Sequence, residues 1–222
     1  ETKQIMKEYV QQCSQCAVER ITAELTKLLA ARKPSLGLKL LAELGLAALI
    51  VPEASSFELC DETSNDLPTR LAALFFTAGK KQTQKRLQKL KFSKNVAVLA
   101  QRLVTFAEIR PEKIIKGSDV RHFVSHVGED IVEQVIDLMK ARNLSKSHEL
   151  ALAVAHERES GCAFTIGDLA INGADVMKTL GVGGGPKVGA ILGQVLKRVL
   201  DNPTLNKRDK LLELLSTMTA EQ

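Results

Sequence analysis

The sequence predicts an all-α protein, an irregular array of many helices. Apolar residues recur at i+3 and i+4 spacing along nearly the whole chain, as on one face of a helix. Serine, asparagine and proline stand where helix N-termini are expected, and no segment alternates polar and apolar residues as a half-buried strand does. The 222 residues are 45% apolar and 26% charged, a composition typical of globular proteins and not of disordered chains.

The opening segment is expected to form one long helix. Its apolar residues repeat every three or four positions, at Ile5, Tyr9, Cys13, Ala17, Ile21, Leu25 and Leu28. This helix should end near Ala31, because Pro34 cannot continue it. A second helix should begin at Ser35 and end at Gly45, which can take the left-handed conformation after a helix.

Serine residues mark the expected starts of helices in the middle of the chain. A buried helix is predicted over residues 67–76, after an acidic segment. Ser93, Ser118 and Ser147 each precede an apolar-periodic stretch and are predicted N-caps. A further apolar stripe lies between the last two, at Ile131, Val135 and Leu138.

Glycine and proline set the expected helix boundaries near the end of the chain. One helix should stop at Gly181, and the next should have Pro186 as its first residue. Asn206 is predicted to cap the last helix. Together these signals predict roughly ten to twelve helices.

Charge is distributed unevenly along a chain whose net charge is +5. Residues 53–66 hold five acidic and no basic side chains, whereas residues 80–102 hold eight basic and no acidic ones. Lys81, Lys85 and Lys89 are four residues apart and form one row along a predicted helix, which we call the lysine row. Because like charges on one face repel, the row indicates an anionic partner such as a phosphate backbone. A merely solvated face is the alternative.

A glycine-rich segment predicts a second anionic contact. Its turn residues are Gly183, Gly184, Gly185 and Pro186. Lys187 follows in the first turn of the next helix, and backbone amides at such a turn can bind phosphate without reading sequence. Lys197 and Arg198 add positive charge further on. The segment is not a P-loop, because no strand precedes it and the Lys-Ser/Thr pair is absent; a tight corner between helices is the alternative.

The sequence holds two clusters of potential metal ligands, but no metal site is predicted. Cys13 and Cys16 form a CxxC, but the remaining cysteines lack the paired spacing of a four-ligand zinc site. His122 and His126 lie one helical turn apart, where a structural role is the alternative to chelation. Four scattered cysteines and no membrane-length apolar stretch predict a reduced, cytoplasmic protein.

Three longer segments carry a family pattern. They are residues 18–29 (VERITAELTKLL), residues 69–80 (TRLAALFFTAGK) and residues 168–177 (DLAINGADVM), the last followed by GPKVG at 185–189. With these motifs the chain resembles the carboxy-terminal neck, body and tail of bacterial tRNA nucleotidyltransferases (CCA-adding enzymes) and the related poly(A) polymerases. The resemblance implies an RNA-binding neck at residues 1–55, a helical body at 56–160 and a tail at 161–222 that binds the tRNA elbow.

The resemblance also assigns roles to particular positions. Glu19, Arg20 and Glu24 match the ERIxxEL neck motif, which in relatives supports the junction with a catalytic head. Phe76 and Thr77 stand where some relatives carry the His-Asp pair of a metal-dependent phosphohydrolase. The resemblance therefore implies a degenerate HD-like body without that metal.

By the same resemblance, tRNA is the expected partner, held at its acceptor stem and elbow. The expected RNA-binding residues are Lys81, Lys85, Lys89, Lys91, Lys94, Lys187, Lys197 and Arg198. In the family a head that precedes the neck binds Mg and CTP or ATP, and its motifs are not found here. No catalytic residue and no cofactor is therefore expected in this chain, which should be inactive alone and could act with a separate head polypeptide or self-associate. The alternative function is a helical scaffold that binds proteins and has no RNA affinity.

Overall fold

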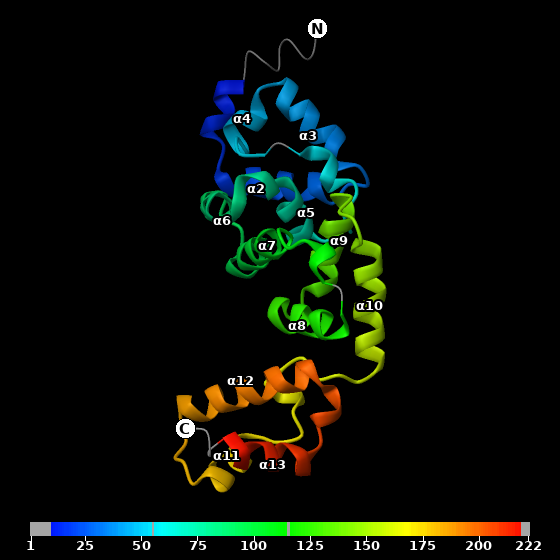
Figure 1. The fold of residues 1–222 in the computed structure, drawn as a ribbon. Coiled ribbons are helices and arrows are strands. Elements are labelled where there is room, and N and C mark those ends of the chain that lie inside the picture. Colours follow the sequence, from blue (N-terminus) through cyan, green and yellow to red (C-terminus); the bar gives the residue numbers. More distant parts are fainter. Residues whose placement is uncertain (1–9, 55, 115, 219–222) are drawn as a thin grey trace. The chain divides into compact units, whose positions relative to one another are not determined.

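The computed structural model describes residues 10–54, 56–114 and 116–218. Within them the chain forms twelve α-helices and six short 3-10 helices and no strand, which confirms the predicted all-α class (Figure 1). None of these helices is long and apolar enough to cross a membrane. The chain divides into two compact units, Glu1–Arg110 with Glu133–Ser147 and Pro111–Val132 with His148–Gln222. The division into neck, body and tail stays a prediction.

The first unit is built around one buried helix, α5. Its elements are η1 (Val10–Gln15), α2 (Val18–Leu29), α3 (Pro34–Glu43), α4 (Leu46–Ile50), η2 (Phe57–Cys60), α5 (Leu67–Leu74), η3 (Phe76–Ala78), α6 (Gly79–Lys89), α7 (Lys94–Phe106) and α9 (Val132–Ala141). Every residue of α5 after Leu67 is buried, and the helix packs against α2, α7 and η2. α5 is therefore the buried centre on which α2, α7 and η2 pack.

The prediction of one continuous opening helix is wrong. Among the described residues, η1 ends before Cys16, and Ala17 has extended backbone angles (φ −58°, ψ 131°) before α2 begins. No glycine or proline marks this break, so local sequence rules do not detect it. The break accompanies tertiary packing, because η1 contacts α4 and Val10 is 9% exposed.

The predicted boundaries around Pro34 and Gly45 are confirmed to within two residues. α2 ends at Leu29, and α3 begins with Pro34 as its first residue. The buried Arg70 donates from Nη1 to the carbonyl oxygens of Leu29 and Ala31, which satisfies acceptors that the end of α2 leaves open. Gly45 follows α3 with a φ of 82°, the left-handed conformation that its position predicts.

The second unit is organised around α12, its longest helix. Its elements are η4 (Pro111–Lys113), α8 (Gly117–Val127), α10 (Ser147–Glu159), η5 (Ile166–Asp168), α11 (Gly173–Leu180), α12 (Pro186–Asp201), η6 (Pro203–Leu205) and α13 (Arg208–Met218). α12 contacts α8, α11 and α13, and its buried face supplies much of this unit's core. Gly181 ends α11 and Pro186 starts α12, as predicted.

The predicted N-caps have mixed outcomes. Ser93 is confirmed, because its hydroxyl accepts the backbone N–H three residues on, at 3.4 Å. Ser118 is wrong, since it lies inside α8, and Ser147 is wrong, since it is the first residue of α10 and not the residue before it. Asn206 is also wrong as a cap: its side chain accepts from Ala170 N–H (2.8 Å) and donates to the Asp168 carbonyl (2.9 Å). Hydrogen bonds to a distant loop thus replace the local cap.

The INGxD part of the tail motif has a structural role in this fold. The Asn172 side chain accepts from the N–H groups of Ala174 (2.9 Å) and Asp175 (3.2 Å), while the Asp175 carboxylate accepts from Asn172 N–H (2.9 Å). Arg208 of α13 donates two hydrogen bonds to the same carboxylate. The Asn172 and Arg208 hydrogen bonds lower the pKa of Asp175. The motif therefore caps α11 and ties it to α13.

Replacing Gly181 with alanine is expected to lower the free energy of unfolding by about 1 kcal/mol, because a side chain disfavours its φ of 63°. Gly183→Ala is the matched control: an added Cβ at either glycine meets nothing within 4 Å, and Gly183 has no positive φ. Urea unfolding of the three proteins measures the difference. Equal effects of the two substitutions would contradict the assignment of strain to backbone conformation.

Candidate nucleic-acid interface

The lysine row lies on α6, as the spacing predicts. Lys81, Lys85 and Lys89 are all exposed, and residues four apart share one helix face. The opposite face is buried through Thr83 and Leu87, and α6 packs against α7. Thr83 also donates to the carbonyl oxygens of residues 75 (3.3 Å) and 79 (2.9 Å). α6 therefore has an anchored inner side and a basic outer side.

Arg86 belongs to the same basic run but points inward. Its Nε and Nη2 each donate to the Glu53 carboxylate at 2.7 Å, and Nη1 donates to the Ile50 carbonyl at 3.3 Å. Arg86 is only 9% exposed. The hydrogen bonds from Arg86 hold the pKa of Glu53 below its ordinary value. This two-pronged ion pair joins α6 to the chain after α4 and removes Arg86 from the outer basic face.

Three more acidic side chains of the segment 53–66 also make contacts within the first unit. Glu58 forms a 2.7 Å ion pair with Lys39. Asp61 accepts from the backbone N–H (2.9 Å) and the hydroxyl (2.6 Å) of Ser35. Asp66 caps α5. These carboxylates therefore serve the fold, a role that sequence reasoning missed; the charge segregation of 53–66 and 80–102 signalled only the Glu53–Arg86 pair.

Two further predicted RNA-binding residues lie next to α6. Lys91 is exposed, has a φ of 55°, and places its ammonium 2.6 Å from a carboxylate oxygen of Glu19. This hydrogen bond lowers the pKa of Glu19. Lys94 is exposed as the first residue of α7. The Glu19 carboxylate of the neck motif therefore partly balances the charge of Lys91. RNA binding by Lys91 and Lys94 stays a prediction.

The remaining neck-motif residues lie on the exposed surface of α2. Glu24 forms a 2.8 Å ion pair with Lys27 one turn along the same helix. Arg20 is exposed on the same helix. The role of the motif at a junction with a catalytic head stays a prediction.

The other predicted contacts lie on the second unit. Lys187, Lys197 and Arg198 are all exposed on α12, with Lys187 in its first turn. The four turn residues before and at the start of α12 are exposed, and Gly185 has a φ of 135°. The turn therefore leads directly into α12, and the three basic side chains lie on that helix. Phosphate binding there stays a prediction.

The described part of the chain holds no group of three or more histidine, cysteine or acidic side chains that could bind a metal. His122 lies with Nε2 at 2.8 Å from a carboxylate oxygen of Asp201, within the second unit. Cys16 is exposed, and the side chain of Cys13 lies outside the described residues. Asp201 is therefore a structural partner of His122.

An aromatic ring occupies the position that the resemblance aligns with the histidine of the His-Asp pair. The guanidinium of Arg142 lies 3.8 Å from the centre of the Phe76 ring, a cation–π contact. Arg142 also donates to the carbonyl of Ala107. Phe76 therefore has a packing role within the first unit.

The fold and surface define an all-helical protein with an exposed lysine row on α6 and further exposed basic side chains on α12. Two family models match: residues 1–58 match "Probable RNA and SrmB-binding site of polymerase A", and residues 66–215 match domain 2 of tRNA nucleotidyltransferases. The second match covers more than half of the chain, which therefore belongs to the tRNA nucleotidyltransferase family. Comparison with curated proteins found no match.

Among solved structures, the chain is similar to the crystal structure of the CCA-adding enzyme of Bacillus stearothermophilus in complex with CTP. The TM-score is 0.82 at 23% sequence identity, over 99% of this chain and 57% of that one. The likeness shows a shared fold. The chain spans little more than half the length of that enzyme.

Glu53→Gln is expected to lower the free energy of unfolding by about 2 kcal/mol at pH 7, because Arg86 stays buried without its ionic partner. Glu58→Gln is the matched control in the same segment; its partner Lys39 is half exposed, so little change is expected. Urea unfolding measures both. Equal losses from the two substitutions would contradict the anchoring role of the Arg86–Glu53 pair.

The effect of Glu53→Gln should also depend on pH. The pKa of Glu53 is lowered in the folded state from an ordinary value of 4.5, so its contribution to stability is present above that value. The contribution is lost as the pH falls through the folded-state pKa. The stability difference between wild type and Glu53→Gln should therefore shrink between pH 7 and pH 3, and a difference that stays constant would exclude the ionised pair as its source.

Proposed function

We propose that this chain is the tRNA-binding, non-catalytic part of a tRNA nucleotidyltransferase that matures tRNA 3′ ends by adding CCA or A. The observation that carries the proposal is the exposed lysine row on α6, held outward by the inward pair of Arg86 and Glu53. The RNA-binding description of the family model for residues 1–58 supports it. Such a row grips the phosphates of a folded RNA by charge and shape, not by base sequence.

Each unit is proposed to bind a different part of the tRNA. The lysine row and Lys94 of the first unit would contact the acceptor stem. The basic side chains of α12 in the second unit, Lys187, Lys197 and Arg198, would contact the elbow. Contacts at both places would select RNAs of tRNA shape over RNAs that only carry the same charge.

Nucleotidyl transfer itself is proposed to belong to a catalytic head that binds Mg and CTP or ATP. That head is either part of the same polypeptide or a separate one. Glu19 and Arg20, both exposed on α2, are the proposed docking residues. The proposed location is the cytoplasm.

The first test compares binding of the chain to a tRNA that lacks its CCA end with binding to an unstructured RNA of equal length, by fluorescence anisotropy across a salt series. Tighter binding of the tRNA, with affinity that falls steeply as salt rises, is expected. Equal affinity for the two RNAs would refute shape recognition by this chain.

Reversing the lysine row (Lys81→Glu, Lys85→Glu and Lys89→Glu together) is expected to weaken tRNA binding and to flatten its salt dependence. Each lost phosphate contact removes about 0.7 to 0.9 from the slope of log affinity against log salt. A control of equal charge change reverses three exposed lysines elsewhere, Lys113, Lys116 and Lys146. A slope that changes equally in both variants would remove the row from the interface.

Reversing Lys187, Lys197 and Arg198 to glutamate is expected to weaken binding of full-length tRNA more than binding of an acceptor-stem minihelix. The reason is that a minihelix has no elbow for α12 to contact. All three side chains are exposed, so the fold of α12 should be kept, as circular dichroism can verify. Equal losses for the two RNAs would argue against an elbow-binding role of α12.

A specific observation favours the alternative, a protein-binding scaffold. α3 and α4 expose large apolar side chains, among them Leu36 (65% exposed), Leu40 and Leu49. Such a surface is typical of protein contacts. Concentration-dependent sedimentation together with no RNA affinity would support the scaffold over the tRNA-binding function.

A further inference from the structure

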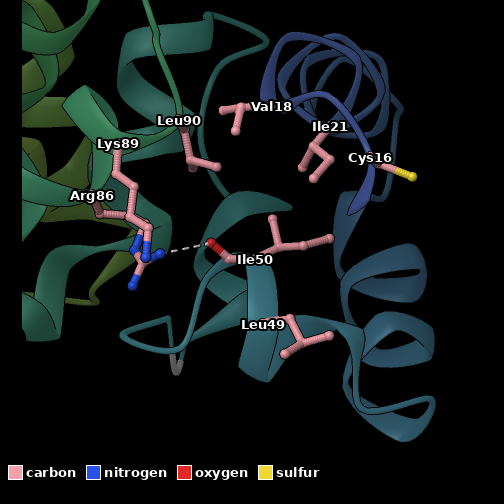
Figure 2. A pocket seen from close by; sticks show the side chains of 8 residues that line it. All are labelled: Cys16, Val18, Ile21, Leu49, Ile50, Arg86, Lys89 and Leu90. Carbon is pink, nitrogen blue, oxygen red and sulfur yellow. Dashed lines mark hydrogen bonds between the residues drawn. The ribbon is translucent and has the colours of Figure 1, made fainter. Parts of the chain in front are cut away.

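We infer that a hollow in the first unit binds one unpaired nucleobase of an RNA held by the lysine row. The hollow has a volume of about 220 Å³. Residues of α2, α4 and α6 line it, chiefly Val18, Ile21, Leu49, Ile50, Arg86 and Lys89 (Figure 2). The inference rests on the proposed function, because the RNA that supplies the base is the one that the lysine row holds.

The walls of the hollow are largely apolar, which suits contact with the flat faces of a nucleobase. Val18 and Ile21 come from α2, and Leu49 and Ile50 come from α4 (Figure 2). These side chains are exposed or half-buried, so the apolar surface is open to a ligand. A nucleobase that enters covers this surface and removes it from water, which is favourable. Among the described residues that line the hollow none is aromatic, so we consider another group for stacking.

Arg86 is the side chain that we propose stacks on the base in the hollow. Its guanidinium donates to both carboxylate oxygens of Glu53, and these bonds fix the orientation of its plane. It also donates to the Ile50 carbonyl (Figure 2). Unpaired RNA bases stack on arginine guanidinium planes as well as on aromatic rings. A plane that is already fixed loses little conformational entropy when a base stacks on it. Arg86 is also a lining residue of the hollow, so the pair that anchors α6 holds in place the group on which we propose that a base stacks.

Lys89 connects the hollow to the predicted phosphate track. It is the last residue of α6, an exposed member of the lysine row and also a lining residue of the hollow. A phosphate bound by Lys89 therefore brings the base of its own nucleotide to the hollow. Charge complementarity and this continuity favour a nucleotide of the RNA over an uncharged apolar side chain of a protein partner.

The test measures binding of the whole chain, by fluorescence anisotropy, to three hairpin RNAs with the same stem. One is blunt-ended, and the others carry one unpaired adenosine at the 3′ or the 5′ end. At least one unpaired adenosine is expected to tighten binding about fivefold or more, the usual scale for stacking a single base. Free AMP at micromolar concentration should not displace the hairpin, since it lacks the neighbouring phosphates.

Two variants fill the hollow from opposite walls, Val18→Phe and Leu49→Phe. Each is expected to abolish the gain from the unpaired adenosine while leaving the affinity for the blunt hairpin and its salt dependence unchanged. The matched control is Val98→Phe, at a position on α7 that is 46% exposed and does not line the hollow. Thermal melting by circular dichroism verifies that each variant is folded, and either folded filling variant suffices for the comparison.

The outcomes separate this inference from the proposed function. A gain that disappears in a folded filling variant and persists in Val98→Phe supports the base site. If the blunt hairpin binds but no adenosine adds affinity, or if the gain persists when the hollow is filled, the base site is refuted and an apolar group of a protein partner becomes the candidate occupant. Displacement by micromolar AMP would refute it in favour of a free-nucleotide site. Failure of all three hairpins to bind would refute the proposed function itself.

Discussion

The ion pair between Arg86 and Glu53 is the interaction on which the candidate interface depends. α6 carries a row of like charges that repel one another, and it buries only a few side chains of its own. The pair connects this helix to the chain after α4 through two hydrogen bonds of 2.7 Å, in a largely buried setting. Because Arg86 is held on the inner side, the lysines of the same run lie on the outer side. One basic segment thus supplies both an anchor and an exposed face.

The acidic segment and the tail motif show how motifs that look functional can serve the fold. The carboxylates of residues 53–66 cap α5, hold Ser35 and pair with α3 and α6. Asn172 and Asp175 of the INGxD motif cap α11 and bind α13 through Arg208. These residues hold together the helical fold that the chain shares with its family. The RNA contacts that we propose therefore use the exposed cations and not these motifs.

Backbone chemistry explains which elements could be predicted. Gly45 and Gly181 take left-handed conformations and Pro186 takes the first position of α12, each a local requirement that one residue type satisfies. The break at Ala17 could not be predicted, because every residue near it is compatible with a helix and packing of η1 against α4 accompanies it. Asn206 has the chemistry of a cap but bonds to a loop 36 residues earlier in the chain.

The helical class, most helix boundaries and the lysine row could be predicted from the sequence, because these follow from spacing and from the conformations that single residues allow. Which basic side chains pair with carboxylates depends on the tertiary fold. Arg86 and Lys91 look like their neighbours in the sequence, yet each pairs with a carboxylate, Glu53 at 33 positions away and Glu19 at 72. Ion pairing and burial depend on such distant contacts, which no local pattern encodes.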